Sequence, residues 1–153
     1  MRLLALILML TLPLAGCGGG GDEGDSDAAG PTVVIETDDG EKEIAVEIAD
    51  TNDERAVGLM GRTSLAEDAG MLFVYPEPTG GGYWMKNTLI PLSIAFYDAD
   101  GTILRILHME PCRRDPCRIY DPGVQYAGAL EVNQGAFERW GVREGDRLGL
   151  RES

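Results

Sequence analysis

The hydrophobic and polar positions along the chain divide it into short runs that are typical of β-strands. Residues 32–37 are rich in β-branched side chains, and residues 43–48 alternate polar and apolar side chains after an Asp-Asp-Gly turn signal. Such a pair of runs predicts a β-hairpin. Residues 71–75 form a continuous apolar run that stops at Pro76, which indicates a strand buried on both faces.

Later segments carry the same signals. A second hairpin is predicted over residues 92–97 and 102–107, because the turn sequence Asp-Ala-Asp-Gly separates the two apolar runs. Residues 124–132 and 147–150 are further strand candidates.

Two short helices are predicted between these strands. Thr51 is a suitable N-cap, acidic residues follow it in the first turn, and the apolar residues up to Met60 share one face. A second helix is predicted from an N-cap at Asn133 through Trp140, with Gly141 just beyond its end.

Seven or eight short strands with two short helices favour one mainly β domain over residues 32–153, either a compact β-sandwich or a partly closed β-barrel. The length of 153 residues also fits a single domain. Tight turns between the strands argue against parallel βαβ units, and the sequence shows no internal repeat.

The first 16 residues have the pattern of a secretory signal peptide. Arg2 precedes an apolar run over residues 3–14, which is too short for a membrane-spanning helix of about 20 residues. Leu14-Ala15-Gly16-Cys17 resembles the bacterial lipobox, in which a lipid is attached to the Cys before cleavage on its N-terminal side. We therefore expect a lipoprotein signal peptide over residues 1–16 and lipidation at Cys17.

This signal predicts an extracytoplasmic lipoprotein in the periplasm or at the cell surface, anchored in the membrane through Cys17. Gly18 follows the Cys in place of Asp, which by resemblance to Gram-negative sorting allows delivery to the outer membrane. Residues 18–31 are Gly-rich and acidic and contain no large apolar side chain, so with Cys17 they form a flexible linker with a reach of roughly 20 Å.

The charge of the chain narrows the choice of partners. The formal net charge is −13, with 26 acidic residues against 13 Lys and Arg. Phosphate backbones are bound by clustered cations that release counterions, so nucleic acid is not an expected partner.

Four stretches carry a resemblance to a known family. They are AVEIADTNDERAVGLMGRTSLAEDAGMLFVYPEP, YWMKNTLIPLSIAFYDADGTI, PCRRDPCRIYDPG and ALEVNQGAFERWGVREGDRLGL. In this order they make residues 45–150 similar to domain of unknown function 192 (DUF192), a bacterial and archaeal family. The resemblance implies a compact, mainly β domain, often behind a signal peptide, and it implies no reaction. Two positions depart from the family pattern: Gly61 replaces a common aromatic residue, and Ser93 replaces the usual Asp.

The two remaining cysteines lie close together in the sequence. Cys112 and Cys117 flank a Pro-containing segment, and two nearby thiols outside the cytoplasm are usually oxidised, so we expect a disulfide. The alternative is a metal site in which both thiols act with His108 in a His-x3-Cys-x4-Cys array.

The segment around Trp84 is the main candidate for ligand binding. Trp84 offers a flat apolar wall, and Lys86, Asn87 and Thr88 offer a cation, an amide and a hydroxyl. Strand alternation places Trp84 and Lys86 on one face and Met85 on the other. The alternative is that these residues only shape a core and a turn.

Arg55 is a further ligand candidate, from the first predicted helix. Arg55 and Arg62 can equally pair with nearby acids, among them Glu131, in a solvated charged rim.

Signatures of catalysis are missing from the sequence. There is one His, no Gly-x-Ser-x-Gly, no His-Glu-x-x-His and no phosphate-binding Gly-rich loop, and we expect no cofactor. The sequence thus favours a membrane-tethered binding or accessory module for a small polar ligand or an envelope protein. An enzyme on envelope carbohydrate, using Lys86, Asn87 and one or more acids, and a metal-handling lipoprotein remain as alternatives.

Overall fold

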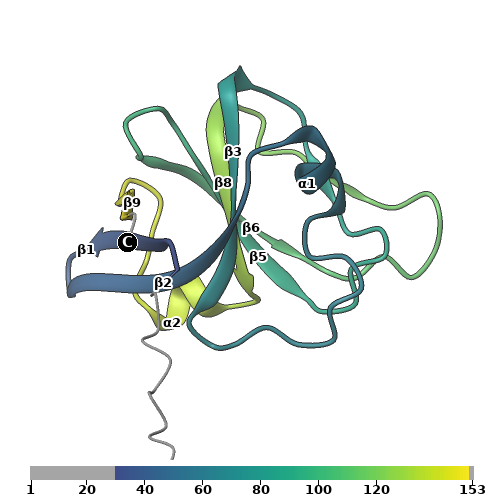
Figure 1. The fold of residues 1–153 in the computed structure, drawn as a ribbon, viewed down its shortest axis with the longest axis horizontal. Coiled ribbons are helices and arrows are strands. Elements are labelled where there is room, and N and C mark those ends of the chain that lie inside the picture. Colours follow the sequence, from purple (N-terminus) through teal and green to yellow (C-terminus); the bar gives the residue numbers. More distant parts are fainter. Residues whose placement is uncertain (1–29, 152–153) are drawn as a thin grey trace, which may run out of the picture.

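The computed structural model describes residues 30–151, which form a strongly curled β-sheet with a short helix on either side of it (Figure 1). The strands are β1 (Thr32–Thr37), β2 (Gly40–Ala49), β3 (Ala69–Thr79), β4 (Tyr83–Trp84), β5 (Leu92–Tyr97), β6 (Ile103–Met109), β7 (Ile119–Tyr120), β8 (Tyr126–Asn133) and β9 (Arg147–Arg151). The helices are α1 (Asn52–Val57) and α2 (Ala136–Arg139). The prediction of a mainly β domain is confirmed. The expected signal peptide and Cys17 lie outside the described residues.

Seven strands share the main sheet in the order β6-β5-β8-β3-β2-β1-β9, and β4 pairs separately with β7. The two outer strands of the main sheet approach each other at one end. Thr102, just before β6, forms a bridge with Arg147 of β9, and the backbone N–H of Leu148 donates to the carbonyl of Gly101 at 2.8 Å. The sheet is therefore a partly closed barrel, one of the two expected architectures.

Both predicted hairpins are present, but the expectation that the fold contains no parallel βαβ unit was wrong at one place. Strands β2 and β3 are parallel, with Ala45 opposite Ala69 and Ala49 opposite Phe73. Residues 50–68, which include α1, make the crossover. A parallel pair needs a connection of about a dozen residues or more, and this segment supplies it.

Strand β3 also continues beyond the proline that was expected to end it. Its ladder with β8 is regular from Gly70 to Val74 and resumes only at Thr79. Pro76 thus falls in a stretch without regular pairing, where its missing N–H interrupts no ladder hydrogen bond.

The central strands bury side chains on both faces of the sheet. One core lies inside the curl, against α2, and contains Val33, Ile35, Ile44, Val46, Leu72, Ala95, Ile103, Leu130, Val132, Ala136, Phe137, Val142 and Leu148. The second core lies on the other face and contains Ala49, Leu59, Met71, Phe73, Met85, Leu92, Ile94, Phe96, Met109, Tyr120, Tyr126 and Ala129. Neighbouring residues of one strand, such as Leu72 and Phe73, therefore enter different cores.

The two helices differ in how well the sequence predicts them. Thr51 caps α1 in a capping box: its hydroxyl accepts from the Glu54 N–H at 3.2 Å, and the Glu54 carboxylate accepts from the Thr51 N–H at 3.0 Å. The predicted cap of α2 was wrong. Its N-cap is Gly135, and the Asn133 amide instead donates to the carbonyls of Leu65 and Ala66, because Asn133 still belongs to β8.

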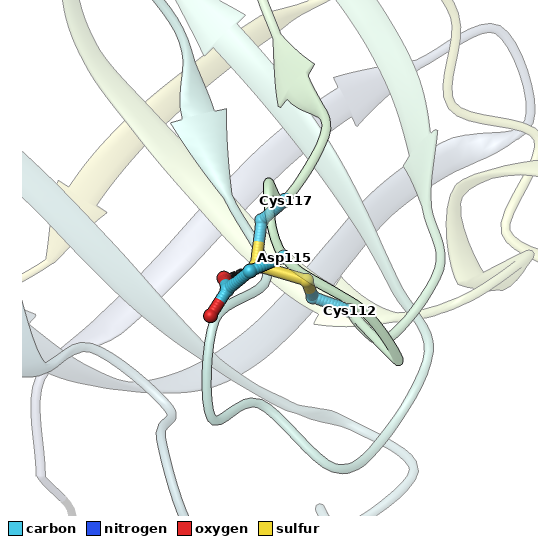
Figure 2. A group of neighbouring side chains, drawn as sticks. All are labelled: Cys112, Asp115 and Cys117. Carbon is cyan, nitrogen blue, oxygen red and sulfur yellow. Dashed lines mark hydrogen bonds between the residues drawn. A yellow bond between two sulfur atoms is a disulfide. The ribbon is translucent and has the colours of Figure 1, made fainter.

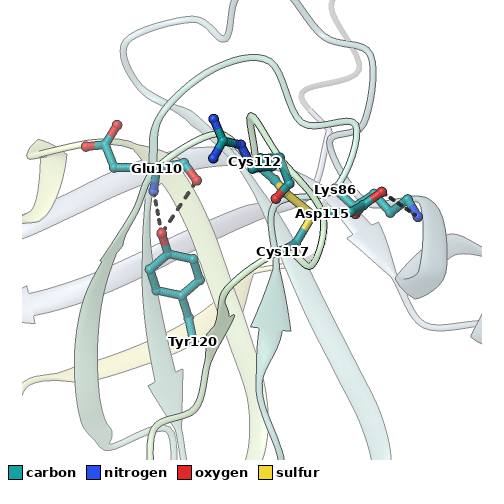
Figure 3. Close-up of a disulfide and its surroundings, with 7 residues drawn as sticks. Lys86, Glu110, Cys112, Asp115, Cys117 and Tyr120 are labelled. Atoms are coloured by element: carbon teal, nitrogen blue, oxygen red, sulfur yellow. Dashed lines mark hydrogen bonds and ion pairs between the residues drawn. A yellow bond between two sulfur atoms is a disulfide. The ribbon is translucent and has the colours of Figure 1, made fainter.

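A disulfide joins Cys112 and Cys117 in the loop between β6 and β7 (Figure 3), as expected. The loop is fastened at its base, where the Tyr120 hydroxyl accepts from the Glu110 N–H at 2.9 Å. The Cys112 N–H also donates to the Met85 carbonyl at 3.3 Å, which ties the loop to the segment after β4. Within residues 30–151, neither helix has the length and apolar character required to cross a membrane.

The disulfide closes a short loop, so replacing both cysteines gives a limited loss of stability. The double variant Cys112→Ser/Cys117→Ser is expected to lower the free energy of unfolding by about 2 kcal/mol, because the unfolded chain regains loop entropy. Urea unfolding at one pH measures this difference. A thiol reductant should destabilise the wild type by a similar amount and leave the double variant unchanged, and an equal response of both proteins would contradict the prediction.

Candidate functional site

A cleft of about 140 Å³ opens on the face of the sheet that carries the second core. One side is formed by residues 55–60, from α1 and the turn that follows it. The other sides are formed by four aromatic residues, Phe73, Tyr75, Tyr83 and Trp84, and by Thr88. The remaining polar side chain in the lining is Glu131 of β8.

Glu131 is the only acidic side chain that lines this cleft, and it is almost completely buried, with 5% of its surface exposed. On the neighbouring strands it lies between Met71 of β3 and Ile94 of β5, both of which belong to the second core. No ion pair or side-chain hydrogen bond joins its carboxylate to another residue from 30 to 151. Because no fully buried side-chain oxygen in this part of the chain lacks a partner, the carboxylate oxygens keep a small contact with the cleft. Burial alone raises the pKa of Glu131 to about 8.

The prediction that Glu131 belongs to a solvated charged rim was therefore wrong. Arg62 pairs instead with Glu47, with both guanidinium-to-carboxylate distances at 2.5 Å. The charge within Ala129-Leu130-Glu131-Val132 was the available signal, because it interrupts a run of apolar residues. On a strand that is buried on both faces, a side chain enters a core whichever face it points to.

The aromatic wall of the cleft is held by ring packing and one buried hydrogen bond. The hydroxyls of Tyr75 and Tyr83 are 2.9 Å apart, and the Tyr83 ring meets Phe73 edge to face at a centroid distance of 5.1 Å. Burial, with the Tyr75 hydroxyl as a second cause, raises the pKa of Tyr83 well above its usual value, so the Tyr83 hydroxyl remains protonated at neutral pH.

Arg55 lies at the edge of the cleft, but its guanidinium is occupied by the protein itself. It donates to the carbonyls of Asp50 and Val74, the latter at 2.7 Å, and to the Asn52 side chain at 2.6 Å. It also stacks on Tyr75, 4.8 Å from the ring centroid. Arg55 thus fastens α1 to the sheet.

The structure divides the other predicted ligand residues into two pairs. Trp84, with 48% of its surface exposed, and the buried Thr88 line the cleft. Lys86 and Asn87 do not line it: the Lys86 ammonium lies 4.0 Å from the Asp115 carboxylate, and the Asn87 carbonyl accepts from the Gly61 N–H. The predicted alternation holds, because Met85 is buried.

The arrangement around the disulfide differs from the metal site that was considered as an alternative. Cys112 and Cys117 are bonded to each other, and Asp115 is the acidic group beside them (Figure 2). His108 lies elsewhere, with its Nδ1 2.9 Å from the Ser93 hydroxyl and its Nε2 2.9 Å from the Glu138 carboxylate. The structure therefore does not bring His108 to the two sulfur atoms.

Both departures from the family pattern have a local structural role. The Ser93 hydroxyl is buried and accepts from the Gly135 N–H at 3.0 Å, which satisfies a donor at the start of α2. Gly61 has a φ of 74°, a left-handed conformation that glycine adopts without strain. Ser93 lies outside the lining of the cleft, so the missing Asp removes no group from it.

A second depression, of about 550 Å³, lies over β1 and β9 and is lined by exposed residues such as Glu36, Glu41 and Arg147. Its charged groups have access to solvent, and no buried polar group faces it. The smaller cleft over Glu131 is therefore the stronger candidate for a functional site.

Comparisons with known proteins agree with the resemblance seen in the sequence. The family model for DUF192, described as "Uncharacterized ACR", matches residues 33–150. A crystal structure of a candidate transcription regulator from Sinorhizobium meliloti 1021 is similar, with 37% identity, a TM-score of 0.72, and coverage of 80% of this chain and 95% of that one. A protein of unknown function from Novosphingobium aromaticivorans DSM 12444 has 31% identity, a TM-score of 0.72, and coverage of 77% and 83%. Curated proteins gave no match.

The raised pKa of Glu131 predicts a specific dependence of stability on pH. Below about pH 4.5 the carboxyl is protonated in both the folded and the unfolded chain. Between there and about pH 8 only the folded chain keeps the proton, so stability falls as pH rises, and above about pH 8 this effect levels off. Relative to Glu131→Gln, the wild type should lose about 1 kcal/mol per pH unit in this window. Urea unfolding of both proteins from pH 5 to pH 9 measures the difference, and a difference independent of pH would contradict the assignment.

Proposed function

The chain belongs to the uncharacterised DUF192 family, and from that premise we propose that its folded domain is a binding module that holds a small polar ligand in the cleft over Glu131. A membrane anchor at Cys17 completes the proposal and places the module on the extracytoplasmic side. The function is therefore capture or presentation of a small molecule at the cell envelope.

The observation that carries the binding proposal is the buried carboxyl of Glu131. A buried ionisable group without a partner costs stability, and such groups concentrate at functional sites. Here it lies in a cleft whose lining combines aromatic rings with other polar residues, Arg55, Tyr75, Tyr83 and Thr88. Polar groups that converge beside aromatic rings are typical of small-molecule sites.

The same cleft favours binding over glycoside hydrolysis. Most glycosidases use two carboxyl groups on either side of the scissile bond. Among the residues that line the cleft, Glu131 is the single carboxylic acid, and Lys86 and Asn87, which the enzyme alternative required, are not part of the lining.

Nucleic-acid binding, which the description of the S. meliloti protein suggests for that protein, is left out of the proposal. This chain has a net charge of −13, and the Arg55 and Arg62 guanidinium groups near the cleft are bonded to oxygen atoms of the protein. A phosphate backbone requires free, clustered cations.

The tether is inferred from the sequence. Leu14-Ala15-Gly16-Cys17 supports lipidation, and the Gly-rich residues 18–31 supply a linker before β1. This organisation supports a folded domain that is held at the membrane surface by its lipid and is not inserted into the bilayer.

A thermal-shift experiment on Trp84 tests the binding proposal. The full chain is melted with a panel of amines, sugars, amino acids and cell-wall fragments, because a ligand that binds the folded state raises the melting temperature. At least one compound class should stabilise the wild type, and the shift should disappear in Trp84→Ala.

Ile119→Ala is the matched control, since Ile119 pairs with Trp84 across β4 and β7, is 55% exposed, and does not line the cleft. It should retain the shift. The binding proposal fails if no compound stabilises the wild type, or if the shift survives in Trp84→Ala.

Cys17→Ser tests the tether separately. The wild-type protein should sediment with membranes and stay there after a carbonate wash, because the lipid holds it in the bilayer. The variant should lack the lipid, which mass spectrometry of the intact protein detects, and should appear in the soluble fraction. Equal sedimentation of both proteins, with no lipid mass on the wild type, would overturn the tether.

A further inference from the structure

We propose that the ligand of this cleft is a small organic cation, whose ammonium group is held by the Glu131 carboxylate against the aromatic wall. This inference rests on the proposed binding function and specifies its ligand class. Three features of the cleft support it: Glu131 has no paired cation among the described residues, aromatic rings form one wall, and the volume is small.

The cleft contains a carboxyl group for which the protein supplies no counter-charge. Glu131 lies between Met71 and Ile94, and no cation of the described chain pairs with it. Attraction between two opposite charges strengthens when water is excluded, so a cationic ligand gains most at this position. An anionic ligand would gain no such attraction, because it would leave the Glu131 carboxyl protonated.

The cations near the cleft are unavailable to neutralise Glu131 or to receive an anion. Arg55 is bonded to Val74 and Asn52, Arg62 to Glu47, and Lys86 lies beside Asp115. Arg55 and Arg62 are hydrogen-bonded to protein oxygen atoms, and no cation among residues 30–151 pairs with Glu131. A ligand can supply the positive charge that these residues do not.

The aromatic wall is suited to the same kind of ligand. The faces of Tyr and Trp rings carry negative potential and attract ammonium groups. The chain already uses its rings in this way: the Arg55 guanidinium lies 4.8 Å from the Tyr75 centroid, and the Lys86 ammonium lies 5.5 Å from the Trp84 centroid. Trp84 keeps 48% of its surface exposed, so part of the indole is open to a ligand.

Size and net charge agree with a small cation. The cleft of about 140 Å³ is smaller than the roughly 300–1,000 Å³ of drug-sized sites. A single ammonium head group suits this volume better than a long polyamine. The net charge of −13 also raises the local concentration of cations around the protein.

Binding of the cation is coupled to loss of one proton. The Glu131 carboxyl passes its proton to bulk water, and the resulting carboxylate pairs with the ammonium group. The ionisable groups that line the cleft with Glu131 are Arg55 from α1, Tyr75 from β3 and Tyr83 from β4. Burial holds the Tyr83 pKa well above its usual value, and the proton comes from Glu131.

Calorimetric titration with choline and with its uncharged isostere 3,3-dimethylbutan-1-ol tests the inference. The full chain in non-ionic detergent should bind choline, and it should bind the neutral isostere at least tenfold more weakly, because the isostere lacks only the positive charge. Choline affinity should increase by roughly 90-fold from pH 6 to pH 9, since burial holds the Glu131 pKa at about 8 in the free protein.

Two variants isolate the carboxylate. Glu131→Gln keeps the shape and removes the charge, so it should lose choline binding and its pH dependence. Glu77→Gln changes an exposed residue of β3 outside the cleft and should behave as wild type. The wild-type pH profile and the isostere comparison test the inference even if Glu131→Gln fails to fold.

The outcomes separate the ligand class from the binding function. Equal binding of choline and its isostere, or choline binding that is independent of pH, overturns the organic cation. The same holds if neutral or anionic compounds stabilise the protein through Trp84 while choline does not. In those cases the binding function stands with another ligand class. If no compound binds in a manner that depends on Trp84, both proposals fail.

Discussion

The burial of three central strands on both faces is the constraint on which the rest of this structure depends. Strands β3, β5 and β8 lie side by side in the sheet, and their alternate residues enter two separate cores. The curl of the sheet and α2 close the first core. The second core needs a cover from elsewhere in the chain, and the segments that provide this cover also form the cleft.

That cover is assembled from segments far apart in sequence. The crossover between β2 and β3 brings α1 over the sheet, and the β4–β7 pair brings Tyr83 and Trp84 beside it. The disulfide loop stabilises this second part, because the Cys112 N–H bonds to the Met85 carbonyl next to β4. The cleft is the space left between these two parts of the cover, and Glu131 of β8 lines it.

Sequence patterns predicted the strands well because each strand depends on local alternation and local turns. The hairpins around Gly40 and Gly101 are examples, and the capping box at Thr51 is another. The parallel pairing of β2 with β3 was missed because it depends on a contact across residues 50–68, which no local pattern reports. Long-range contacts also explain why only part of the site was predicted. Trp84 and Thr88 were identified from the chemistry of their side chains. Glu131 was assigned to the surface because its burial depends on α1 and β4, which lie far from it in the sequence.

Glu131 offers the clearest distinction between structure and function in this domain. A buried polar residue that stabilises a fold has partners, as Ser93 does with Gly135 and His108. Glu131 has none among the described residues, and burial raises its pKa to about 8, so its ionised form is a cost to the folded state. An apolar residue of similar size would avoid that cost. A ligand that supplies a positive charge would offset that cost by pairing with the carboxylate.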